Sequence, residues 1–196
     1  MKSDRVLSTA EERRAKVVAS AVAAFARGGL HAVTVADVAK HAGISPAYVL
    51  KLFTSKTQLF AAALDECYRR IGEAMERGAA QAEEETPEAL LHTMGGAYAE
   101  LIGERDLLML QVHAQSAMAE PLIADAVRRG AAGITDYVAA RSKASGRQVQ
   151  EFMAFGQLCH LLTTIDAFGI DEPWAKLLTE GFRHSDPIEP PGGAPD

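Results

Sequence analysis

The sequence has few aromatic residues, few cysteines and no long apolar run. Aromatic residues make up 6% of its 196 residues, and the only cysteines are Cys67 and Cys159. They are far apart in apolar patterns, so we expect reduced core thiols rather than a disulfide framework. No stretch approaches the ~20 apolar residues of a membrane span, and the charged start has no signal peptide. These absences predict a cytoplasmic protein without a membrane partner.

Strand-like alternation and the sequence motifs of common enzymes are also missing. The six histidines form no H-x-x-x-H or E-x-x-H pair, and the chain has neither G-x-G-x-x-G nor a P-loop. We therefore expect no enzyme, no metal and no cofactor. Between Pro46 and Pro173 the only prolines are Pro87 and Pro121, which leaves room for long helices. The predicted fold class is all-α.

What the chain does contain is typical of a core-forming helical protein with a basic beginning. It is 48% hydrophobic and 23% charged, which argues against disorder. Residues 1–60 carry nine Lys or Arg against four Asp or Glu, whereas the remaining residues carry 11 against 22. A basic head on an acidic body favours a polyanionic partner for the head alone.

Apolar spacing and breaker residues predict a series of helices. Gly28-Gly29 ends the first one, whose apolar face holds Val18, Val22 and Phe25. The tail at 185–196 is rich in proline and glycine and is predicted to be disordered. The predicted helices span about 10–27, 34–41, 45–53, 55–81, 87–104, 106–118, 121–145, 148–168 and 173–183.

Two of these helices are short and are joined by the turn AGIS at 42–45. Thr34 and Asp37 are spaced as a capping box, and Ser45 followed by Pro46 suits a helix start. Two short helices around a glycine-containing turn predict a helix-turn-helix over about 34–53. Its second helix would present its first turn to base edges in a major groove. Val49, Leu52 and Phe53 would pack inward, and Tyr48 and Lys51 would face the DNA.

The stretch FARGGLHAVTVADVAKHAGISPAYVLKLFTSKTQLFAAAL, from Phe25 to Leu64, resembles the N-terminal domain of TetR-family transcriptional regulators. The resemblance extends back to Ala10 and covers roughly the first third of the chain. Thr34 would then touch a phosphate, Tyr48 would read bases, and Lys56 would hold a phosphate by its charge and the local amide groups. The full set of DNA-binding residues that the resemblance implies is Thr34, Val35, Ser45, Pro46, Ala47, Tyr48, Lys51 and Lys56.

One position departs from the family pattern. The family commonly has tyrosine where this chain has Leu50, and a small residue where it has Tyr48. The two positions differ by about 200° around a helix, so Tyr48 cannot simply replace the lost contact. Leu50 either meets a thymine methyl group or only packs.

The resemblance implies a repressor that binds a palindromic operator as a homodimer and is released by a small-molecule inducer. Residues 9–69 would form the DNA-binding domain, and residues 70–184 the ligand-binding and dimerisation domain. The helix at 148–168 is apolar nearly all round, so we expect a partner copy to cover one side. The expected interface residues are Gly156, Cys159, Thr163 and Trp174.

Flexible or amphipathic side chains in the C-terminal part suggest a mostly apolar pocket. Among them His113 is distinctive, because burial of an imidazole requires a hydrogen-bond partner. The residues expected in the pocket are Met94, Tyr98, Met109, His113, Tyr137, Phe152 and Phe155. Two alternatives to a ligand-controlled repressor stay open, namely a helical protein–protein adaptor and a DNA-binding regulator without a small-molecule ligand.

Overall fold

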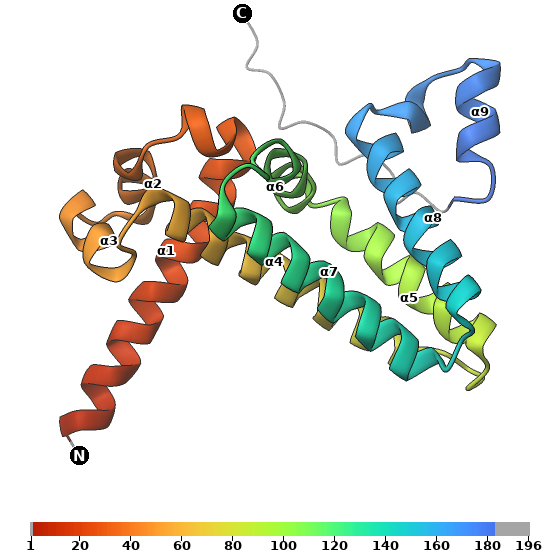
Figure 1. The fold of residues 1–196 in the computed structure, drawn as a ribbon, viewed down its shortest axis with the longest axis horizontal. Helices are drawn as coiled ribbons and strands as arrows, with labels where there is room; N and C mark the ends of the chain where they lie inside the picture. The colour runs from red at the N-terminus through yellow and green to blue at the C-terminus, as the bar shows by residue number, and fades with distance from the viewer. Residues whose placement is uncertain (1, 183–196) are drawn as a thin grey trace, which may run out of the picture.

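The structure, a computed structural model, describes residues 2–182, with side chains from residue 10 onward. The predicted disordered tail at 185–196 lies outside the described residues. No strand occurs within 2–182, and the all-α prediction is confirmed (Figure 1). The helices are α1 (Lys2–Ala32), α2 (Val35–Ala42), α3 (Pro46–Leu52), α4 (Lys56–Ala80), α5 (Pro87–Ile102), α6 (Arg105–Ser116), α7 (Pro121–Ser142), α8 (Gly146–Thr164) and α9 (Pro173–Thr179), with a 3-10 turn at Ala167–Gly169.

The first helix is longer than the sequence predicts. It begins at Lys2 rather than near residue 10, because neither glycine nor proline occurs before Gly28 to stop it. A break at the predicted Gly28-Gly29 position is confirmed, since Gly29 has a φ of 65°, which residues with a Cβ rarely adopt, but helical turns continue beyond it to Ala32. A Cβ at Gly29 would also lie 2.8 Å from Nδ1 of His113, so α6 packs directly on this break.

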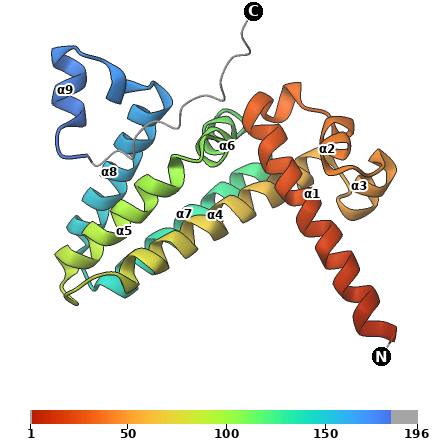
Figure 2. The ribbon, with the colours of Figure 1, turned by 180° about the vertical axis from the view of Figure 1, so that it is seen from behind.

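Helices α1, α2 and α3 form a small head at one end of a longer helical body (Figures 1 and 2). α4 leaves the head and runs beside α7, while α5 runs beside α8. The head and the body share one continuous apolar core that includes Phe25 and Phe60, whose ring centroids are 4.8 Å apart. The expected domain boundary between residues 69 and 70 falls inside α4, so this helix contributes to both the head and the body.

The last helices end earlier than predicted, at residues with backbone conformations that stop a helix. α7 ends at Ser142 because Lys143 adopts a φ of 53°, and Ser145 then caps α8 in a capping box with Gln148. α8 ends at Thr164, followed by Asp166 with a φ of 53°. Within residues 2–182, none of the helices combines the length and apolar character needed to cross a bilayer.

Candidate DNA-binding surface and ligand cavity

The helix-turn-helix is built from local capping interactions. The hydroxyl of Thr34 accepts a hydrogen bond from the backbone N–H of Asp37 at 3.2 Å, and the backbone N–H of Thr34 donates to the Asp37 carboxylate at 2.8 Å. Hydrogen bonds from the Thr34 side chain and backbone lower the pKa of Asp37. Gly43, with a φ of 69°, then reverses the chain. Both ends of α2 are thereby fixed, and this stabilises the turn that leads into α3.

α3 has an inward side and an outward side. Ser45 caps it by accepting the backbone N–H of Tyr48 at 3.2 Å, and Pro46 occupies the first helical position. Val49 is fully buried, whereas Leu50 is 46% exposed and therefore does not serve as core filler. The outward side presents Pro46, Ala47, Leu50 and Lys51.

The structure brings the predicted DNA-binding residues together at one end of the molecule, on α2, α3 and the start of α4 (Figure 1). Val35, Tyr48 and Lys56 are half-buried, and the remaining five are exposed: Thr34, Ser45, Pro46, Ala47 and Lys51. Tyr48 has a neighbour that sequence reasoning missed. The guanidinium of Arg13 on α1 lies 6.0 Å from the centroid of its ring.

Most basic side chains of the body are paired with carboxylates, whereas those described in the head are not. Between residues 10 and 60, no Lys or Arg forms an ion pair with a carboxylate in the described structure. The positive charge of the head is therefore available for an external anion. In the body, seven arginines are paired with Asp or Glu: Arg69, Arg70, Arg105, Arg128, Arg129, Arg141 and Arg147.

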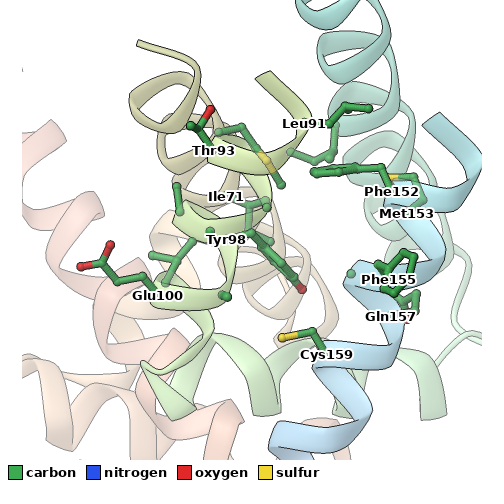
Figure 3. Close-up of a pocket in the computed structure, with 18 of the residues that line it drawn as sticks. Ile71, Leu91, Thr93, Tyr98, Glu100, Phe152, Met153, Phe155, Gln157 and Cys159 are labelled. Atoms are coloured by element: carbon green, nitrogen blue, oxygen red, sulfur yellow. The ribbon is translucent and has the colours of Figure 1, made fainter. Parts of the chain in front are cut away.

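A cavity of about 1060 Å³ lies among α4, α5, α6, α7 and α8. Figure 3 shows Tyr98 extending from α5 toward α8, where Phe152 and Phe155 contribute to the opposite wall. Burial raises the pKa of the Tyr98 hydroxyl, so this group stays a neutral hydrogen-bonding group at physiological pH. The charged lining residues are all solvent-exposed: Arg77, Glu100, Glu104 and Glu151. The buried part of the cavity therefore suits an uncharged group.

Three of the seven expected pocket residues line this cavity: Tyr98, Phe152 and Phe155. Met94 is buried in the core, and Tyr137 lines a smaller depression between α4 and α7. Met109 and His113 do not line the cavity, and His113 is only half-buried, against Gly29.

The expectation that these four share a pocket with the others does not fit the structure, because Met94 is packed in the core and Met109, His113 and Tyr137 lie outside the cavity.

Among the cavity residues that sequence reasoning missed are Tyr68 and Gln111. Tyr68 on α4 lies in the wall shared by the cavity and the smaller depression, and burial raises the pKa of its hydroxyl to about 12. Gln111 on α6 is buried and lines the cavity. The only signal in the sequence is that Gln111 lies one helical turn from the apolar Leu107 and therefore on the same face of the helix. The same spacing is equally typical of a core residue, so it does not identify a cavity residue.

The described residues hold no metal-binding cluster, and both of their cysteines are buried. No cluster of three His, Cys, Asp or Glu side chains could hold a metal between residues 2 and 182. Both cysteines are buried thiols, and burial raises the pKa of Cys67 to about 12 and also raises that of Cys159. Thiols of this kind are poor nucleophiles at neutral pH.

The expected dimer stripe on α8 faces the chain's own body. Cys159 is buried, and Gly156 lies beside Tyr98, whose ring would be 3.8 Å from an added Cβ. Close approach of two partner backbones along Gly156, Cys159 and Thr163 therefore does not fit this structure. Trp174, the fourth expected interface residue, is exposed.

Exposed apolar side chains collect instead at the C-terminal end. Of nine large apolar residues exposed in the described chain, six lie between Phe155 and Leu178. An apolar surface of this kind is typical of a protein–protein interface. We call five of them the α8–α9 apolar residues: Leu161, Ile165, Trp174, Leu177 and Leu178.

Comparison with known proteins gives a family match for the head and structures of similar fold for most of the chain. Residues 17–63 match the family model described as bacterial regulatory proteins, tetR family. No curated protein sequence matches the chain. The members of the matched family are transcriptional regulators and not enzymes, which agrees with the sequence prediction.

Solved structures with the same fold cover nearly the whole chain. A TetR-like transcriptional regulator from a Rhodococcus species is 22% identical, with 85% of this chain and 91% of that chain covered and a TM-score of 0.62. The fatty acid degradation regulator FadR from Bacillus halodurans is 17% identical, with coverage of 88% and 97% and a TM-score of 0.62. FadR from Bacillus subtilis in complex with stearoyl-CoA is 16% identical, with coverage of 86% and 98% and a TM-score of 0.64.

Proposed function

From the premise that this chain carries the DNA-binding domain of the tetR family, we propose that it is a cytoplasmic transcriptional repressor. It binds a palindromic operator as a homodimer and leaves the operator when a small, mainly apolar ligand enters the body. The observation that carries DNA binding is the outward side of α3, capped by Ser45 and flanked by basic side chains without internal partners. Such a surface fits base edges and phosphates at once.

The homodimer is supported by the α8–α9 apolar residues and by the size of the reading helix. α3 has seven residues, so one copy reads only a few base pairs, and useful specificity requires two copies on two half-sites. Leu177 is 71% exposed in the single chain, and contact with a partner copy would remove its apolar surface from water. A two-fold axis near α8 and α9 leaves both heads available for DNA, since the heads lie at the opposite end of the body (Figure 2).

The ligand class is supported by the cavity. Its volume suits a drug-sized or lipid-like molecule, and its buried lining offers Tyr98 and Gln111 as neutral hydrogen-bonding groups. Any charged group of the ligand would sit at the exposed rim, where Arg77 and the glutamates lie. The similar FadR of Bacillus subtilis is described with stearoyl-CoA, which makes this compound a suitable first probe for the present chain.

Lys56→Ala should weaken binding to operator and random DNA by the same factor. Each phosphate contact contributes about 0.9 to the slope of log affinity against log salt, so the slope should fall by about 1.8 for a dimer. Leu50→Ala should leave the slope unchanged and reduce the preference for operator, because the exposed leucine would lose a thymine methyl contact. Fluorescence anisotropy at several salt concentrations measures both quantities. An unchanged slope for Lys56→Ala would remove this residue from the interface.

Ligand and operator should each lower the protein's affinity for the other by the same factor. Stearoyl-CoA and uncharged apolar compounds that raise the melting temperature would be titrated by calorimetry with and without saturating operator. We expect operator to lower ligand affinity by about 5- to 150-fold, and linkage requires the ligand to lower operator affinity equally. Equal affinities in the two titrations would mean that a ligand in this cavity does not control DNA binding.

A cavity-filling variant separates the cavity from the rest of the body. Gly156→Leu should reduce ligand affinity while operator affinity stays unchanged, because the new side chain extends toward Tyr98. Gly133→Leu on α7 is the control, since an added Cβ there meets nothing within 4 Å. Loss of ligand binding in both variants would argue against this cavity as the site.

The alternative of a protein–protein adaptor has a simple test. Retention of the wild-type protein on random DNA with a steep salt dependence supports the regulator, because an adaptor has no need to displace condensed counterions. Absence of any DNA retention at low salt would overturn the proposed function.

A further inference from the structure

Arg13 of α1 is held against the first turn of the recognition helix α3. Its guanidinium carbon lies 6.0 Å from the ring centroid of Tyr48, within the range of a cation–π contact. The backbone N–H of Tyr48 donates to the capping Ser45, so this ring belongs to the N-terminal turn of α3. α1 therefore places a positive charge where α3 would enter a groove.

The charge of Arg13 has no internal partner. Its side chain is exposed, and no carboxylate of the described chain pairs with it, in contrast to the paired arginines of the body. Tyr48 is half-buried, and its ring restricts the guanidinium without neutralising it. A long side chain that is already restricted loses less conformational freedom on binding an anion.

The neighbouring Arg14 provides a contrast. Its guanidinium carbon lies 4.5 Å from the ring centroid of Phe53, which is only 1% exposed. Arg14 therefore covers the edge of the head's core, a packing role. Tyr48 is itself a surface residue, so the Arg13–Tyr48 contact adds nothing comparable to the core.

We propose that Arg13 binds a phosphate of the operator backbone beside the groove that α3 enters, and that Tyr48 is the residue that positions it. This inference rests on the proposed function. A guanidinium presents a planar pair of N–H donors that matches two phosphate oxygens. The contact is to backbone and not to bases, because the major groove has room for one helix and Arg13 projects from a flanking one. Tyr48 thus acts through Arg13 rather than as an independent base reader.

The test compares Arg13→Gln with wild type on operator selected from a random pool and on random DNA, over a range of salt concentrations. Arg13→Gln should weaken binding to both DNAs by about the same factor and reduce the salt slope by about 1.8 per dimer. Arg13→Lys should keep the slope but bind several-fold more weakly than wild type, since the ammonium cannot bind a phosphate in the bidentate manner. Thermal melting verifies that each variant is folded.

Tyr48→Leu tests the positioning role. It should produce part of the loss seen for Arg13→Gln, and the double variant should bind only slightly less well than Arg13→Gln alone. Additive losses in the double variant would show that Tyr48 acts independently of Arg13 and would overturn the positioning role.

Arg27→Gln is the matched control. It removes the same charge from the same helix, about 21 Å further along the axis at 1.5 Å per residue, and Arg27 is likewise exposed and unpaired in the described chain. An equal slope change in Arg27→Gln would mean a general charge effect and would overturn the proposal.

Three further outcomes complete the test and separate this inference from the proposed function. A change in operator preference without a slope change would make Arg13 a base reader and overturn the phosphate contact. Normal DNA binding by wild type with no effect of Arg13→Gln would overturn only this inference. Failure of wild type to bind any DNA would overturn the proposed function and this inference with it.

Discussion

We expect Leu177→Glu to convert the proposed homodimer to a monomer and to lower its operator affinity by about 100-fold or more. Leu177 is the most exposed of the α8–α9 apolar residues, and a carboxylate there would be buried without a partner in the dimer. Losing the dimer removes the linkage of two heads, which is worth about 10²–10⁴ in avidity. Sedimentation velocity at micromolar concentration measures the mass, and anisotropy with operator DNA measures the affinity.

Leu122→Glu is the matched control for this result. Leu122 is a 50% exposed leucine near the start of α7, away from α8 and α9. The same substitution there should leave both mass and operator affinity unchanged. A dimeric mass for Leu177→Glu would place the interface elsewhere on the chain, and a monomeric wild type would exclude the homodimer.

Gly78→Ala destabilises the body by about 1–3 kcal/mol, the usual cost of overpacking. A Cβ at Gly78 would lie 2.6 Å from the carbonyl oxygen of Thr93 and 2.9 Å from the Cα of Met94. Both atoms belong to the α5 backbone, so α5 as a whole must move away from α4. Urea unfolding followed by circular dichroism measures the free energy of unfolding.

Gly72→Ala on the same helix should shift stability the other way. An added Cβ at Gly72 meets nothing within 4 Å. Alanine should therefore stabilise the protein by about 0.4–1 kcal/mol, because it restricts the unfolded chain. A loss of stability in both variants would mean that the close approach of α4 and α5 at Gly78 is not the cause.

The helix-turn-helix was predictable to within one or two residues because its signals are local. The Thr34–Asp37 capping box, the Ser45 cap and the break in α1 at Gly29 are all present as predicted. Each depends on residues at most four apart, and the structure of the rest of the chain has little influence on them. The early start of α1 was missed because no cap marks it.

The sequence predicts a mostly apolar cavity but does not identify most of the residues that line it. Spacing along one helix assigns residues to a face, but it does not say which neighbouring helix covers that face. His113 illustrates this, since α6 turns it toward Gly29 of α1 while Gln111 faces the cavity. The Arg13–Tyr48 contact joins residues on two helices and has no signal in the spacing of either one.

In the proposed regulator, the single helix α4 connects the ligand cavity to the DNA-binding head. With 25 residues at 1.5 Å per residue, it is about 37 Å long. A tilt of about 5° around its far end moves the end at Lys56 by roughly 3 Å, close to the ~3.4 Å rise between base pairs on one strand. In a two-fold dimer, opposite displacements of the two heads would double this change in their separation. A rearrangement of less than one water diameter around α5 and α8 is therefore geometrically sufficient to put two recognition helices out of register with their half-sites.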